Sequence, residues 1–92
     1  MTEVDVMMEV IGLVNDGAIV RAQERVLEIE TAPIGAPRLP SSVFERVLRA
    51  ALRAECLTTD YEAFCRRSYG RHWPEVRDQA RASSRPPKAV RS

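Results

Sequence analysis

The segment that most constrains the fold is residues 41–57, with the sequence SSVFERVLRAALRAECL. Its apolar residues recur at steps of three and four, which places them on one face of an α-helix. They are Val43, Phe44, Val47, Leu48, Ala51 and Leu52. Ser42 and Glu45 have the spacing of a capping box, and Pro40 stands just outside, where a helix can begin. The segment therefore predicts an amphipathic helix that the rest of the chain packs against.

Two more helices are predicted upstream, joined by the turn signal Asn15-Asp16-Gly17. Residues 2–14 carry a polar stripe at helical spacing, and Thr2 is a candidate N-cap. The stripe comprises Thr2, Asp5, Glu9 and Gly12. Residues 18–30 carry an apolar stripe that comprises Ile19, Ala22, Val26 and Ile29.

A β-hairpin closed at Asp16-Gly17 is the alternative, because residues 2–14 are rich in β-branched side chains. Neither hairpin register produces a clean apolar face, which a half-buried strand pair requires. We therefore favour an α-hairpin.

Residues 31–40, TAPIGAPRLP, hold three prolines and a glycine and predict an irregular connection packed by Ile34 and Leu39. Residues 60–69 predict a helix with Tyr61, Phe64, Cys65 and Ser68 on one face. Thr59 and Glu62 form a second candidate capping box at its start, and Gly70 is suited to its end. Pro74 suits the first position of a last helix, and residues 83–92, SSRPPKAVRS, predict a disordered tail.

The expected fold class is mainly α, a bundle of four to five short helices. The alternative is an α+β fold in which an N-terminal β-hairpin precedes two to three helices. We expect one domain over residues 1–82 and a flexible basic tail over residues 83–92.

The net charge of +1 hides an asymmetry between the two halves of the chain. Residues 1–30 contain seven acids and two bases, a net charge of −5, whereas residues 31–92 contain six acids and twelve bases, a net charge of +6. The halves can attract each other within one molecule or head-to-tail between subunits, and the basic half can attract an acidic partner.

The sequence indicates a cytoplasmic protein with no membrane span. The N-terminus is acidic and lacks the basic start of a secretory signal, and no apolar run approaches the ~18–20 residues that span a bilayer. Lys88 is the only lysine among fourteen bases. Such an arginine-rich composition is typical of a GC-rich genome and suggests a bacterial, phage or plasmid source.

No catalytic, cofactor or metal site is predicted. Cys56, Cys65 and His72 match no zinc-ligand spacing, and Cys65 with His72 lacks an orienting acid. We expect both cysteines to be reduced. The chain contains no phosphate-binding glycine loop, GxSxG or HExxH motif, so we expect it not to be an enzyme.

The best candidate for a protein contact lies around the turn that follows residues 60–69. It gathers aromatic and arginine side chains, which are enriched at binding hot spots. The candidate residues are Arg66, Arg67, Tyr69, Arg71, His72 and Trp73. The structural alternative is that Trp73 closes the end of the core.

The alternative candidates would contact nucleic acid through an arginine-rich helical face and the tail. They are Arg46, Arg49, Arg53, Arg85, Lys88 and Arg91. Helices 42–57 and 60–69 have the outline of a helix-turn-helix, but Asp60 and Glu62 would stand where the second helix meets phosphates.

The sequence thus favours a small non-catalytic protein-binding module that acts as an adaptor, an inhibitor or an accessory subunit. A homodimer through residues 4–29 is one form of this hypothesis. A small nucleic-acid-binding regulator is the alternative.

Overall fold

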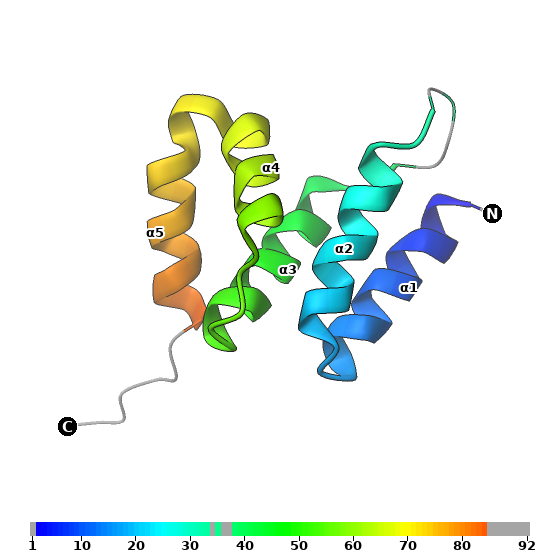
Figure 1. The fold of residues 1–92 in the computed structure, drawn as a ribbon, viewed down its shortest axis with the longest axis horizontal. Helices are drawn as coiled ribbons and strands as arrows, with labels where there is room; N and C mark the ends of the chain where they lie inside the picture. Colours follow the sequence, from blue (N-terminus) through cyan, green and yellow to red (C-terminus); the bar gives the residue numbers. More distant parts are fainter. Residues whose placement is uncertain (1, 34, 36–37, 85–92) are drawn as a thin grey trace.

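The structure, a computed structural model, describes residues 2–33, 35 and 38–84. In chain order the elements are α1 (Glu3–Asn15), α2 (Ile19–Glu30), α3 (Ser41–Arg53), α4 (Thr59–Tyr69), the short 3₁₀ helix η1 (Gly70–His72) and α5 (Trp73–Ser84) (Figure 1). The described residues contain no strand. The predicted mainly α fold is confirmed, and the β-hairpin alternative for the N-terminal segment is wrong.

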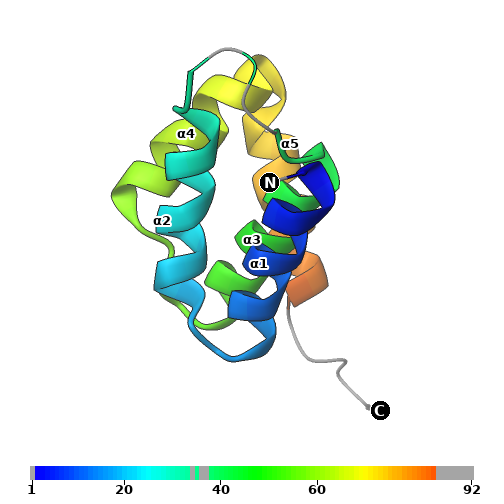
Figure 2. The ribbon, with the colours of Figure 1, turned by 90° about the vertical axis from the view of Figure 1, so that its right-hand side faces the viewer.

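The central helix is α3, which packs against α1, α2 and α5. Helices α1 and α2 lie side by side as an antiparallel hairpin, and α4 and α5 form the other side of the molecule (Figures 1 and 2). The predicted apolar face of α3 is buried at Val43, Val47, Leu48 and Ala51. The amphipathic pattern of this one segment therefore organises both halves of the domain.

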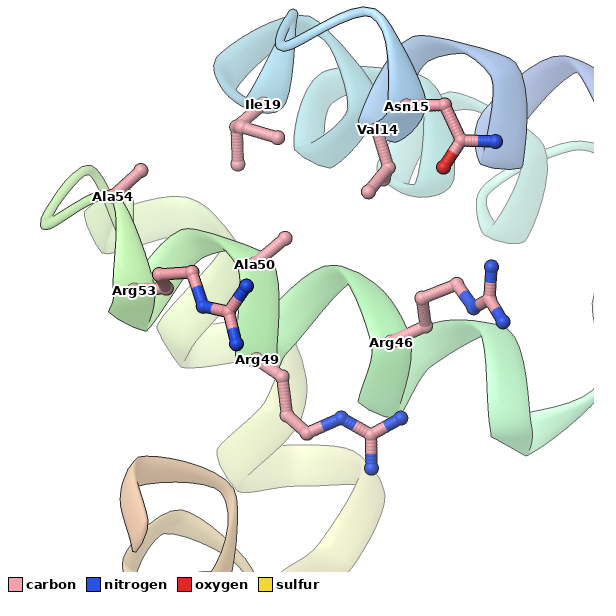
Figure 3. Close-up of a pocket in the computed structure, with 8 residues that line it drawn as sticks. All are labelled: Val14, Asn15, Ile19, Arg46, Arg49, Ala50, Arg53 and Ala54. Carbon is pink, nitrogen blue, oxygen red and sulfur yellow. The ribbon is translucent and has the colours of Figure 1, made fainter. Parts of the chain in front are cut away.

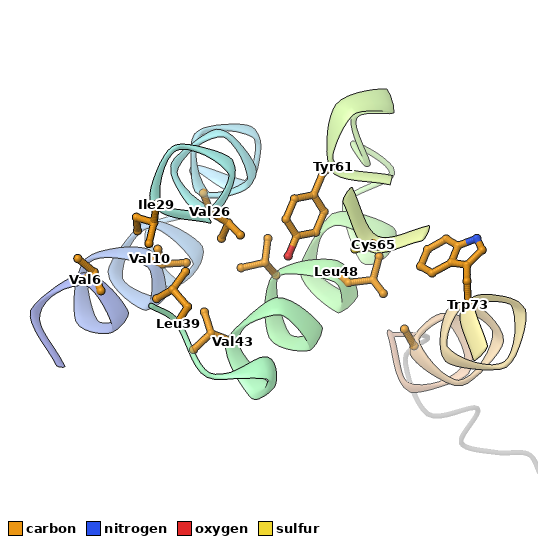
Figure 4. Packing of buried hydrophobic residues seen from close by; sticks show 13 residues of the cluster. Val6, Val10, Val26, Ile29, Leu39, Val43, Leu48, Tyr61, Cys65 and Trp73 are labelled. Atoms are coloured by element: carbon orange, nitrogen blue, oxygen red, sulfur yellow. The ribbon is translucent and has the colours of Figure 1, made fainter. Parts of the chain in front are cut away.

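One apolar core extends across the molecule from Val6 of α1 to Trp73 of α5 (Figure 4). Tyr61 is fully buried, and its hydroxyl donates a hydrogen bond of 2.9 Å to the carbonyl oxygen of Phe44. Burial raises the pKa of the Tyr61 phenol well above its usual value. The rings of Phe44 and Phe64 meet edge to face with centroids 5.2 Å apart, which ties α3 to α4.

The predicted helix starts are partly correct. In α1 Thr2 is the N-cap, as expected, and its hydroxyl accepts from the Asp5 N–H. The Asp5 carboxylate also accepts from the Thr2 N–H, which completes a capping box that was not predicted from the sequence. In α3 the predicted Ser42–Glu45 box is wrong. That helix begins at Ser41, so Ser42 is already helical and the extended residue before the helix is Pro40, which makes no side-chain cap.

The predicted Thr59–Glu62 box of α4 is also wrong, by one residue. Thr58 has the extended backbone of an N-cap, and its hydroxyl accepts from the Tyr61 N–H at 3.1 Å. Thr59 is the first helical residue, and the Glu62 carboxylate pairs with Arg66 at 2.8 Å.

Helix α1 ends in the turn that the Asn15-Asp16-Gly17 signal predicted. Gly17 has a φ of +83°, and the next amide, of Ala18, donates back to the Leu13 carbonyl at 2.9 Å. A hydrogen bond to the carbonyl five residues back, next to a left-handed residue, defines a Schellman turn.

Helix α3 ends in the same turn with a different residue. The Cys56 N–H donates to the Ala51 carbonyl at 2.9 Å, and the left-handed position is held by Glu55 with a φ of +56°. A side chain at this position costs free energy that glycine avoids.

A buried amide links the two halves. The Gln23 side chain is fully buried, and its nitrogen donates to the carbonyl oxygens of Ile19 at 3.2 Å and Cys56 at 3.1 Å. Its oxygen accepts from the Thr58 N–H at 2.9 Å. Gln23 of α2 therefore holds the connection between α3 and α4.

The proline-rich connection is held by Glu30, at the end of α2. Its carbonyl accepts from Arg38 at 2.8 Å, and its carboxylate accepts from the N–H of Leu39 at 3.2 Å. Leu39 is buried in the core as expected, whereas Ile34 lies outside the described residues.

Helix α5 begins one residue before the predicted Pro74 and continues through Ser84, two residues into the segment expected to be a tail. The rest of that segment, residues 85–92, lies outside the described residues, so its flexibility stays a prediction.

Candidate protein-binding surfaces

Helix α1 presents apolar side chains on the side that faces away from the core. Val4 and Met8, one turn apart, are 59% and 60% exposed, whereas Val6 and Val10 are buried. This arises because α1 is apolar around most of its circumference, and the domain buries only one side. We call Val4 and Met8 the α1 apolar face.

Acidic side chains border this face. Glu3 and Asp5 flank Val4 in the first turn, and α1 contains no basic residue. Hydrogen bonds from the backbone and the hydroxyl of Thr2 hold the pKa of the Asp5 carboxyl below its usual value. The Glu3 carboxylate makes no hydrogen bond or ion pair with the described residues. A surface that complements the α1 apolar face is therefore itself apolar and carries positive charge.

A cleft of about 470 Å³ lies between the α1–α2 turn and the C-terminal part of α3. Apolar side chains lie on both sides of it, Val14 and Ile19 on one and Ala50 and Ala54 on the other, and Arg46 extends towards Asn15 (Figure 3). The remaining lining residues are Arg49 and Arg53. Among the residues that the structure describes, no acidic side chain lines this surface, which we call the arginine cleft.

Two of the arginines of the cleft have different surroundings. Arg49 pairs with Glu45 of the same helix at 3.4 Å. Arg46 is exposed, and its side chain makes no ion pair or hydrogen bond with any described residue. Its guanidinium is therefore available to an external carboxylate or phosphate.

The structure brings together half of the predicted nucleic-acid candidates, because Arg46, Arg49 and Arg53 all line the arginine cleft. The other three, Arg85, Lys88 and Arg91, lie outside the described residues.

The predicted protein-contact turn divides into inward-facing aromatic residues and outward-facing basic residues. Trp73 is only 5% exposed and belongs to the core, which is the structural alternative left open by the sequence. Tyr69 is half-buried against the same core, and burial raises the pKa of its phenol. The basic members of the group are exposed at the surface: Arg66, Arg67, Arg71 and His72.

The two cysteines are free thiols. Cys65 is buried, and burial raises the pKa of its thiol to about 12, so it remains protonated at neutral pH. Within the described residues, no group of three or more His, Cys, Asp or Glu side chains is placed to hold a metal ion.

The α1 apolar face lies within residues 4–29, the range for which the sequence suggested a homodimer, and that hypothesis stays a prediction. The arginine cleft was not predicted, because the sequence places its arginines on one helix but does not indicate which residues stand opposite them. Helices long and apolar enough to cross a membrane are lacking in the part of the chain that the structure describes. Comparisons with protein-family models, with curated proteins and with solved structures find no match.

Proposed function

We propose that the chain is a non-catalytic protein-binding module of the cytoplasm, acting as an adaptor, an inhibitor or an accessory subunit. The observation that carries this proposal is the α1 apolar face, because Val4 and Met8 expose more than half of their surface on a small domain whose other large apolar side chains are mostly covered. Exposed apolar surface rimmed by charge is typical of a protein interaction site.

The partner surface should be apolar and basic. The α1 apolar face is bordered by Glu3 and Asp5, with no base in the helix, so an acidic partner would be repelled. Two copies of α1 would repel each other for the same reason. This favours a contact between α1 and a different surface over the symmetric pairing of two α1 helices.

The test is a pull-down from a native lysate with the tagged chain and a double variant, Val4→Asn with Met8→Gln. The matched control is Val20→Asn, since Val20 is also apolar and 44% exposed but lies on α2. The proposal expects a stoichiometric protein that the wild type and the control capture and the double variant does not. Equal capture by all three proteins would refute it.

A small nucleic-acid-binding regulator is the second candidate, and the observation that favours it is the gathering of three arginines at one cleft. It expects the captured material to vanish after nuclease treatment and binding to fall steeply with salt. Nuclease-resistant capture that depends on Val4 and Met8 would exclude it as the main function.

A further inference from the structure

The chain carries both halves of one complementary contact. The α1 apolar face offers apolar side chains bordered by carboxylates, and the arginine cleft offers apolar side chains together with guanidinium groups. These are different surfaces, since Val4 and Met8 are in the first half of α1, whereas the cleft touches only its last turn. We infer that the arginine cleft of one copy receives the N-terminal half of α1 from a second copy.

The charges select this partner. A planar guanidinium binds a carboxylate well, often through two parallel hydrogen bonds. Glu3 and Arg46 are exposed, and neither is paired with any described residue, so their contact would break no existing ion pair. The net charges of −5 for residues 1–30 and +6 for residues 31–92 favour the same head-to-tail approach over long range.

The apolar groups supply the short-range attraction. Val4 and Met8 are exposed in the single copy, and Val14, Ile19 and Ala50 face the cleft. Docking would remove both sets from water, which is the main favourable contribution to most protein associations. Because donor and acceptor surfaces differ, the contact is heterologous and produces a ring or an open chain of copies rather than a two-fold dimer.

This inference rests on the proposed function, because it uses the α1 apolar face as the contact surface and names the partner as a second copy. The experiment is sedimentation velocity of the purified full chain between about 10 and 500 µM, a range that resolves weak association. The wild type is expected to increase in mean mass with concentration, and less so at high salt.

A charge-swap pair tests the contact itself. Glu3→Arg and Arg46→Glu should each weaken self-association about tenfold, because each replaces an attraction by a repulsion. An equimolar mixture of the two variants should associate again, since each cleft then meets an α1 of opposite charge. Matched controls are Glu75→Arg, which also changes a first-turn glutamate, and Arg67→Glu, an exposed arginine on α4. Both controls should behave like the wild type.

Several results would overturn the inference. The wild type could remain a monomer throughout, or Arg46→Glu could associate as strongly as the wild type, as a symmetric α1 dimer would. Failure of the mixture to associate would be equally decisive. None of these results affects the pull-down with Val4 and Met8 variants, so a failed self-contact and a failed binding function can be told apart.

Discussion

Replacing Gln23 by methionine tests whether the buried amide holds the two halves of the domain together. Methionine keeps the length of the side chain and removes its hydrogen bonds. The Thr58 N–H, which donates to Gln23 at 2.9 Å, and the Cys56 carbonyl, which accepts at 3.1 Å, would then lose these partners. An unsatisfied buried polar group costs about 1–3 kcal/mol, and the added apolar surface recovers part of this.

We therefore expect Gln23→Met to lower the free energy of unfolding by about 2–3 kcal/mol. For a chain of this size that lowers the melting temperature by roughly 8–24 °C. The assay is urea unfolding followed by far-UV circular dichroism and by the emission of Trp73, the single tryptophan, which is buried. Gln79→Met is the matched control, because Gln79 is an exposed glutamine on α5.

A second substitution at the same position should make the loss of stability depend on pH. Gln23→Glu places a carboxyl group beside two carbonyl oxygens, so burial and these acceptors raise its folded-state pKa above the unfolded value of about 4.3. The protonated form can donate and the ionised form cannot. The unfolding free energy that Gln23→Glu loses relative to wild type should be largest above the raised pKa and should shrink as the pH falls towards about 4.3. The role of the amide would be refuted if Gln23→Met lost no more unfolding free energy than Gln79→Met. A loss of unfolding free energy in Gln23→Glu that did not depend on pH would refute it as well.

Three further predictions test the ends of the helices and the thiols. Glu55→Gly should stabilise the protein by about 0.5–1 kcal/mol, because it removes a side chain from a residue with a left-handed backbone. Ala54→Gly, at the neighbouring residue with a right-handed backbone, should not stabilise it, and thermal melts compare the two variants. An aromatic disulfide reagent should label half-buried Cys56 in a fast phase and buried Cys65 only on unfolding. If Cys65→Ser, and not Cys56→Ser, removed the fast phase, the burial of Cys65 would be contradicted. Because the pKa of Asp5 is lowered in the folded protein, its carboxylate contributes to stability above the ordinary pKa, and this contribution is lost as the pH falls through the lowered pKa. The free energies of unfolding of wild type and Asp5→Asn should therefore differ at neutral pH and converge in acid.

The features predicted correctly depend on repetition along the chain. The apolar spacing of α3 repeats over three turns, so single deviations do not change the outcome, and the buried face follows directly. The ion pairs Arg21–Glu24 and Arg25–Glu28 of α2 also follow from helical spacing, because residues three apart are neighbours on a helix, and they form at 3.5 and 3.2 Å. Helix starts were less predictable, because adjacent residues of similar chemistry, such as Thr58 and Thr59, compete for one cap.

The features that escaped prediction depend on residues distant in the sequence. Nothing near Gln23 indicates that its partners are in the connection between α3 and α4, more than thirty positions away. The arginine cleft likewise needs Val14 and Ile19 to stand opposite α3. Trp73 was a candidate contact residue because tryptophan is enriched at binding hot spots. In a chain with one core and five aromatic residues, however, the largest ring is needed to fill the core, and Trp73 is buried there.

The central position of α3 has a consequence for how the domain opens. Because α3 packs against α1, α2 and α5, neither half can separate without exposing apolar side chains of that helix. Local opening that leaves α3 intact is limited to the outer helices. The amide protons in the middle of α3 should therefore exchange with solvent only through global unfolding, and the whole domain should melt as a single cooperative unit.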